Sequence, residues 1–232
     1  MSGWQKPLGV AVGTTAAVTA LSYGLPEGHA ATGVGLGFLA ATWLVALRHD
    51  DSAEIRRFGL SLGGLLEPEA IDRRRMLRDA LHAIAWAVGL ALVVFPPFWA
   101  GYVFWWKPAQ AFVPRLPGDP LDEVLGQLLV IALPEEAFYR GYLQTAFDDA
   151  WEPRWNVLGA RLGPGLLVAS TLFALGHLAT EVHPNRLAVF FPALVFGWLR
   201  KRSGGIGAPL LFHALCNLFA SFLGRSYGLF SG

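Results

Sequence analysis

Long stretches without a charged residue dominate the pattern of hydrophobic and polar positions. Five of them, between 19 and 27 residues long, lie at 7–26, 28–47, 80–106, 162–180 and 203–224. Since a helix rises about 1.5 Å per residue, each is long enough to cross a hydrocarbon layer of about 30 Å. Backbone polar groups inside lipid must be satisfied within the protein, so we expect these stretches to form transmembrane helices.

Two weaker segments complete the predicted set. Residues 187–199 are uncharged but only 13 long, and they lie between Arg186 and the basic run 200–202. Residues 124–147 are apolar apart from a few polar side chains, among them Glu135, Glu136, Arg140 and Gln144. The sequence therefore predicts an all-α, polytopic membrane bundle of about seven transmembrane helices. With no internal repeat or linker, we expect residues 1–232 to form a single integral membrane domain.

The third predicted helix and the segment before it have features of their own. Pro96 and Pro97 are expected to kink or end the helix over 80–106. Trp105 and Trp106 stand near its end, where interfacial aromatic residues gather. The segment 48–79 carries seven arginines with leucines between them. We expect it to lie along the inner interface as a short amphipathic helix in contact with anionic lipid, or as a solvated basic loop.

The basic residues predict the orientation of the bundle. With the N-terminus in the cytoplasm and seven spans, 13 of the 18 Lys and Arg residues fall on the cytoplasmic side and four outside. Because cytoplasmic loops carry an excess of Lys and Arg, we expect an N-in, C-out topology. The high usage of Ala, Gly, Leu and Arg suggests a bacterial protein, which would place the chain in the cytoplasmic (inner) membrane.

Composition removes several other classes of protein. Hydrophobic residues make up 54% and charged residues 15% of the chain, against about 25% charged residues in soluble domains. A net charge of +1 gives no reason to expect a nucleic-acid partner. The single cysteine, Cys216, excludes a disulfide framework and a cysteine-based metal cluster.

Ionisable residues inside the predicted spans are the main functional signal. A charged side chain at the bilayer centre costs roughly 2.5–3.5 kcal/mol on insertion scales, so such residues usually serve a function. Three spans together carry six polar side chains, which are Glu135, Glu136, Arg140, His177, His213 and Asn217. We expect them to converge on one site.

Helical geometry suggests a role for each glutamate. Glu136 and Arg140 are four residues apart in the order that favours an ion pair. Glu135 is rotated by about 100° from Glu136, so Arg140 neutralises it less. We therefore expect Glu135 to be the carboxylate that is free to act on water as a general base.

The histidine-bearing spans are expected to supply the rest of the site. His213 and Asn217 are also four residues apart, and together they offer an imidazole and an amide to a developing oxyanion. Phe173 lies one turn before His177 and would form a wall of the same cavity.

Three motifs occur in order on these spans: EExxxR at 135–140, FxxxH at 173–177 and HxxxN at 213–217. In this order and setting they resemble the CPBP family of intramembrane proteases. That family includes the CAAX prenyl endopeptidases and bacteriocin-processing, self-immunity and C-terminal-sorting relatives. The resemblance covers roughly residues 122–224, whereas the first hundred residues match only as generic membrane helices.

The resemblance implies a glutamic-type endopeptidase. Glu135 and His177 would activate the attacking water, His213 and Asn217 would stabilise the oxyanion, and Glu136 with Arg140 would support the site. The substrate would be the C-terminal tail of a membrane-associated or exported protein, with or without a lipid. No cofactor is expected, because the chain has no HExxH motif and a glutamate-activated water needs no metal. Zinc held by Glu135, His177 and His213 is the alternative.

A non-enzymatic function is the other hypothesis. A transporter, or a self-immunity protein that binds a partner, would use the same intramembrane charges without hydrolysis.

The depth of the polar residues within their spans indicates the side of the membrane from which the site is reached. Glu135 and His213 lie near the centres of their spans, whereas His177 lies about 8 Å from the centre of its span towards the outside. That position leans towards a site that opens outwards and would suit trimming of exported proteins, whereas the CAAX endopeptidases that the motifs resemble are expected to act on cytoplasmic tails.

Overall fold

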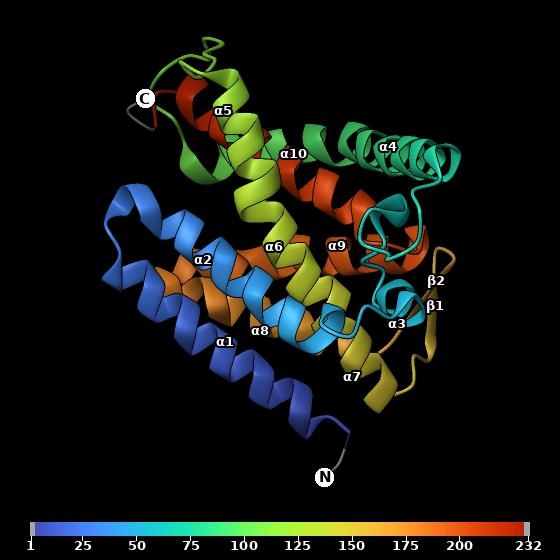
Figure 1. Cartoon of the computed structure of the whole chain (residues 1–232). Coiled ribbons are helices and arrows are strands. Elements are labelled where there is room, and N and C mark those ends of the chain that lie inside the picture. The colour runs from blue at the N-terminus through green and yellow to red at the C-terminus, as the bar shows by residue number, and fades with distance from the viewer. Residues whose placement is uncertain (1–2, 230–232) are drawn as a thin grey trace.

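The computed structural model describes residues 3–229 and is built mainly of helices (Figure 1). The long helices are α1 (Gln5–Gly24), α2 (Glu27–Thr42), α4 (Arg73–Trp106), α8 (Pro164–Thr180), α9 (Phe190–Ser203) and α10 (Gly207–Ser226). Three stretches are long and apolar enough to cross a membrane: Glu27–Leu47, which adds the π-helical η1 (Trp43–Leu47) to α2, then Arg73–Trp106 and Gly207–Ser226. The other helices are shorter or less apolar, so seven spans and their orientation stay predictions.

A continuous helical run crosses the centre of the bundle from residue 120 to residue 150 (Figure 1). It consists of α5 (Pro120–Leu125), η3 (Gly126–Ala132), α6 (Leu133–Glu135), η4 (Glu136–Leu143) and α7 (Gln144–Ala150). Asp119 caps its start by accepting hydrogen bonds from the backbone N–H groups of Leu121 and Asp122. The segments η3 and η4 are π-helical, a wider winding that is frequent at functional sites.

Helix α4 does not end at its two prolines. It continues through Pro96 and Pro97 as far as Trp106. Aromatic packing against α10 accompanies this continuation, because the ring of Phe95 stacks on that of Phe219 with centroids 4.3 Å apart and Phe98 packs 6.0 Å from the same ring. These contacts hold the chain on both sides of the prolines, where backbone hydrogen bonds are lost.

The arginine-rich segment packs into the core of the protein. It forms α3 (Ser52–Arg57) and the 3-10 turn η2 (Leu62–Gly64). Ile55, Phe58 and Leu60 are each at most 4% exposed and belong to the main core. A Cβ on Gly141 would lie only 2.7 Å from the Leu60 side chain, so η4 packs closely on this segment. Its apolar residues therefore pack into the protein core, and its contact with anionic lipid stays a prediction.

A buried carboxylate fastens the same segment to the start of α4. The Glu67 side chain is 2% exposed and pairs with two guanidinium groups. Arg75 Nη1 donates to it at 2.8 Å and Arg56 Nε at 3.0 Å. The hydrogen bonds from Arg75 and then Arg56 hold the pKa of Glu67 well below its usual range.

The fold is mostly helical, as expected, and one small hairpin interrupts the helices. Strands β1 (Trp155–Val157) and β2 (Ala160–Leu162) form an antiparallel hairpin between α7 and α8. Leu158 and Gly159 connect them with φ angles of 49° and 78°, as a tight two-residue hairpin turn requires. The indole of Trp198 on α9 donates to the carbonyl of Val157 at 2.9 Å and anchors the hairpin.

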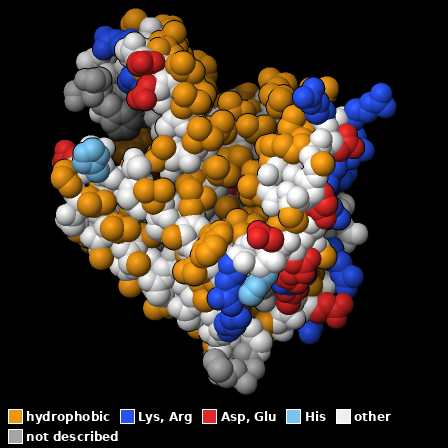
Figure 2. Space-filling view, viewed as in Figure 1, with side chains coloured by type: hydrophobic (Ala, Val, Ile, Leu, Met, Phe, Trp, Pro, Cys, Tyr) orange, Lys and Arg blue, Asp and Glu red, His pale blue; other side chains and the backbone are white. Residues whose placement is uncertain are grey.

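The distribution of side chains fits a protein embedded in lipid. Phe138, Leu143 and Phe147 on the central run are fully buried. Leu92 and Phe104 on α4, in contrast, are 73% and 76% exposed, which is costly in water. Figure 2 shows hydrophobic side chains over much of one view of the molecule, with Lys and Arg gathered along its right-hand and lower edge. Together with the membrane-spanning helices, this identifies an integral membrane protein.

Candidate active site

The EExxxR motif lies at the join between α6 and the π-helical η4. Glu136 and Arg140 form the ion pair that their spacing predicts, with Arg140 Nη1 3.1 Å from Glu136 Oε1. Both side chains are almost completely buried, at 0% and 2% exposure. Glu135 ends α6, is 12% exposed and has no such ion pair with Arg140. Within residues 3–229, its Oε2 atom is buried without a hydrogen-bond partner.

His213 on α10 lies between the two glutamates. Its Nδ1 atom is 2.9 Å from Glu136 Oε1, and its Nε2 atom is 3.8 Å from Glu135 Oε2. Because a carboxylate accepts hydrogen bonds, the proton of a neutral His213 belongs on Nδ1, where it is donated to Glu136. The sequence reasoning paired Glu136 with Arg140 only, whereas one oxygen of Glu136 serves both Arg140 and His213.

His177 near the end of α8 is held by its own helix. Its Nδ1 atom lies 3.0 Å from the backbone carbonyl oxygen of Phe173. A carbonyl can only accept, so Nδ1 carries the hydrogen in this contact and Nε2 of the neutral ring is left as an acceptor. The ring also packs 4.3 Å from the Phe173 ring, centroid to centroid. An imidazole fixed in this way can take a proton at Nε2.

Asn217 lies one turn after His213 and contacts a residue that the sequence reasoning overlooked. Its Nδ2 atom donates to Oε1 of Gln127 in η3 at 2.9 Å. Gln127 is the amide in the predicted span 124–147 that was not counted among its polar residues. An amide side chain inside an apolar span can be noticed from the sequence, as Gln144 in the same span was. Gln144 is structural: it is 1% exposed and donates to the carbonyl of Gly197 at 3.0 Å.

Aromatic rings enclose the charged side chains. The guanidinium carbon of Arg140 lies 4.2 Å from the ring centroid of Phe173 and 5.1 Å from that of Phe196. Phe196 also stacks on His213 with centroids 4.7 Å apart. Phe173 is 2% exposed and lines the cavity, as predicted, whereas Phe196 was not expected from the sequence. These rings stabilise a buried cation and fix the imidazole plane.

One cavity of about 1040 Å³ joins the predicted residues. Its lining includes Glu135, His177, His213 and Asn217, together with Phe173 and Gln127. Cys216 lines it as well. Most of the remaining lining is apolar or aromatic. Four potentially reactive side chains therefore share one largely apolar chamber, while Glu136 and Arg140 support it from the protein interior.

Metal binding has no obvious set of ligands in this chamber. Among residues 3–229, no three His, Cys, Asp or Glu side chains are grouped so that they could hold a metal ion. A reaction without a cofactor remains a prediction from the sequence.

Comparison with known proteins supports the resemblance seen in the motifs. Residues 117–219 match the family described as type II CAAX prenyl endopeptidase Rce1-like. This range contains all three motifs and nearly coincides with the predicted range 122–224. No curated protein and no solved structure matches the chain.

Proposed function

From the match of residues 117–219 to the Rce1-like CAAX prenyl endopeptidase family, we propose that the chain is an intramembrane endopeptidase of the glutamic type. It hydrolyses a peptide bond near the C-terminus of a membrane-associated or exported polypeptide. The observation that carries the proposal is that Glu135, His177, His213 and Asn217 line the same apolar cavity. Its setting is the cytoplasmic membrane of a bacterium.

Glu135 and His177 activate the attacking water. A water between Glu135 Oε2 and His177 Nε2 would donate one hydrogen to each acceptor. As its oxygen attacks the carbonyl carbon, one proton passes to Glu135. The same proton then goes to the leaving nitrogen as the carbon–nitrogen bond breaks, which yields a carboxylic acid and an amine. General acid–base catalysis of this kind contributes about 10²–10⁴-fold to a rate.

His213 and Asn217 stabilise the oxyanion of the tetrahedral intermediate. Asn217 Nδ2 uses one hydrogen for Gln127, which leaves its second hydrogen for the substrate. In its doubly protonated form His213 would donate Nδ1–H to Glu136 and offer Nε2–H to the cavity. Glu136 keeps Nδ1 of this ring engaged, and Arg140 balances the charge of Glu136. Each oxyanion donor is worth about 10²–10³-fold in kcat.

The cavity suits an apolar peptide tail. Its volume of about 1040 Å³ is at the upper end of the range of about 300–1,000 Å³ that is usual for ligand pockets. Aromatic residues such as Phe98, Tyr102 and Trp105 line it beyond the polar group. They would contact aliphatic side chains or an attached lipid chain of the substrate.

Replacing Glu135 tests the reaction directly. The substitution Glu135→Gln keeps the size of the side chain but removes the base, so we expect cleavage of a prenylated CAAX-type peptide by the purified protein to fall by about 10²–10⁴-fold. Glu152→Gln is the matched control, since the Glu152 side chain is 77% exposed, pairs with Arg161 and does not line the cavity. Equal activity of the Glu135→Gln variant and the control would refute the proposal.

The alternative of a transporter or a non-catalytic binding protein is not favoured by the family match. It would be supported if the Glu135→Gln variant retained the biological activity of the protein in cells. A binding function needs the shape and polarity of the cavity but no base.

A further inference from the structure

The cavity occupies only one end of the helix bundle. Helix α4 contributes to its lining only from residue 98 onwards, and α10 only from 213 to 221. Helix α8 contributes its last two turns, and α9 only its first half. The same end holds the turn between α1 and α2 and the 3-10 segment η5 (Pro184–Val189). We call it the rim end.

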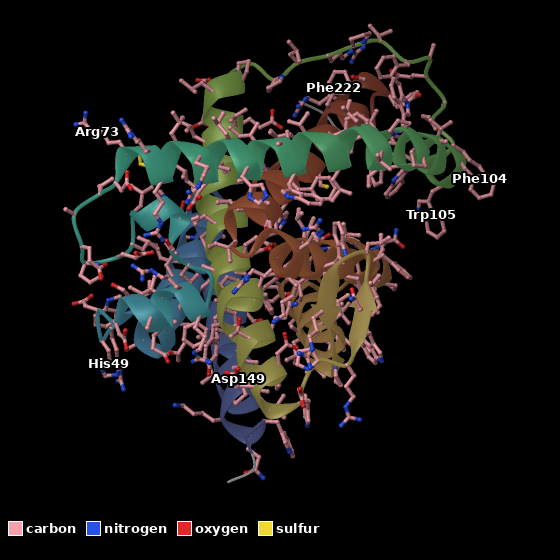
Figure 3. All side chains as sticks on the ribbon, turned by 90° about the vertical axis from the view of Figure 1, so that its right-hand side faces the viewer. His49, Arg73, Phe104, Trp105, Asp149 and Phe222 are labelled. Atoms are coloured by element: carbon pink, nitrogen blue, oxygen red, sulfur yellow. The ribbon has the colours of Figure 1, made fainter. Side chains whose placement is uncertain are left out.

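The opposite end of the bundle carries most of the basic residues. It holds the start of α4 with Arg73, Arg74 and Arg75, the end of α9 with its basic run 200–202, and the segment 48–57. Figure 3 shows Arg73 at one end of α4, and Phe104 and Trp105 at the other. Trp105 lines the cavity. The rim of the chamber and the arginine-rich start of α4 therefore lie at opposite ends of this helix.

The bundle is closed between the site and the basic end. Leu143 and Phe147 lie two to three turns after Glu135 along the central run, towards the basic end, and both are fully buried. The ring of Phe147 stacks on that of Trp151 with centroids 5.4 Å apart. Leu199 on α9 and Ile206 before α10 are likewise fully buried at this end. Close packing of these side chains separates the cavity from the basic end along this part of the described bundle.

The rim end has the polar features of an entrance. Asn185 is exposed, and Arg186 beside it has a side chain that is 38% exposed. Among residues 3–229, Arg186 is the only Lys or Arg residue lining the cavity, and it makes an ion pair with Glu181 at 3.3 Å. Trp105 and Trp106 lie at the same end, where interfacial aromatic residues are expected to mark the edge of the hydrocarbon layer.

Charge and geometry together set the side from which substrate arrives. Loops rich in Lys and Arg stay in the cytoplasm, so the basic end faces inwards. We propose that the active-site cavity opens on the non-cytoplasmic side of the membrane, and that its substrate is a tail of an exported or membrane-anchored polypeptide presented from that side. The orientation stands on charge and geometry, whereas the cleavage of the tail rests on the proposed endopeptidase function.

Cysteine labelling tests the orientation without any need for activity. In a Cys216→Ser background, Asn185→Cys places a thiol at the rim and Asn156→Cys places one on the hairpin at the basic end, where Asn156 is exposed. With a membrane-impermeant maleimide on intact bacterial spheroplasts, we expect the first variant to be labelled and the second only after permeabilisation. The reverse pattern would overturn the proposal.

A second measurement tests delivery of the substrate. A membrane-impermeant fluorogenic peptide with a CAAX-type tail is added to sealed right-side-out vesicles and to sealed inverted vesicles. We expect cleavage in the right-side-out vesicles and its loss in the inverted ones; cleavage confined to inverted vesicles would overturn the proposal. If neither preparation cleaves the peptide and detergent does not restore cleavage, the endopeptidase proposal fails while the labelling still decides the orientation.

Discussion

Removal of the Arg140 guanidinium is a severe test of the physics of this site. In the substitution Arg140→Met, a flexible apolar side chain replaces a cation that is 2% exposed. Glu136, at 0% exposure, then loses its ion-pair partner at 3.1 Å. Its remaining contact at that oxygen is the hydrogen bond from His213 at 2.9 Å.

The expected loss of stability follows from burial. Breaking a buried ion pair by removing one partner costs about 3–5 kcal/mol, because the other charge stays buried without compensation. The contact of Arg140 with Phe173 at 4.2 Å adds about 0.5–2 kcal/mol, whereas the retained hydrogen bond from His213 reduces the loss. We therefore expect about 3–5 kcal/mol, which in a chain of this length corresponds to a fall in Tm of about 6–20 °C.

The measurement is unfolding of the purified protein in detergent, monitored by intrinsic tryptophan fluorescence. The double variant Glu136→Gln/Arg140→Met leaves no buried charge at the pair, so it should recover most of the lost stability. A loss below about 1 kcal/mol for Arg140→Met would show that the pair behaves like a solvated surface pair. A double variant less stable than the single one would equally refute the reasoning.

Two further predictions concern a missed residue and a structural carboxylate. Gln127→Leu removes the acceptor that orients the Asn217 amide, so kcat should fall by about tenfold with little change in KM. Gln127→Asn should restore part of the lost kcat. Equal kcat in both variants would contradict this role of Gln127. Because the folded pKa of Glu67 is depressed, its stabilisation is complete above about 4.5 and is lost as pH falls towards the folded value. Glu67→Gln should flatten this acid dependence in pH-resolved unfolding, and an unchanged profile would contradict it.

Local spacing made parts of the site predictable. Glu136 and Arg140 are neighbours on one helical face, so their ion pair needs no knowledge of the tertiary fold. Phe173 and His177 meet for the same reason, and the order of the three motifs indicated that the spans converge. The roles of Glu135, His177, His213 and Asn217 in the reaction remain predictions that follow from this convergence.

Features that depend on distant residues were beyond the reach of the sequence. The contact between Gln127 and Asn217 joins residues 90 positions apart, and nothing local marks Gln127 as its partner. Seven arginines made the segment 48–79 look like surface, although Ile55, Phe58 and Leu60 bury their side chains in the core. The hairpin rests on Leu158 and Gly159, a turn that a count of uncharged stretches does not detect.

The two π-helical segments give the central run room for a change of length. A π turn holds one residue more than the α turn that it replaces. Deletion of a single residue from Gly126–Ala132 would let that segment close into an α-helix, and the residues after it would keep nearly the same direction because the lost residue is the extra one. Glu135 would then still face the cavity. A one-residue gap at this point, upstream of an intact EExxxR, is therefore compatible with an aligned site in a relative.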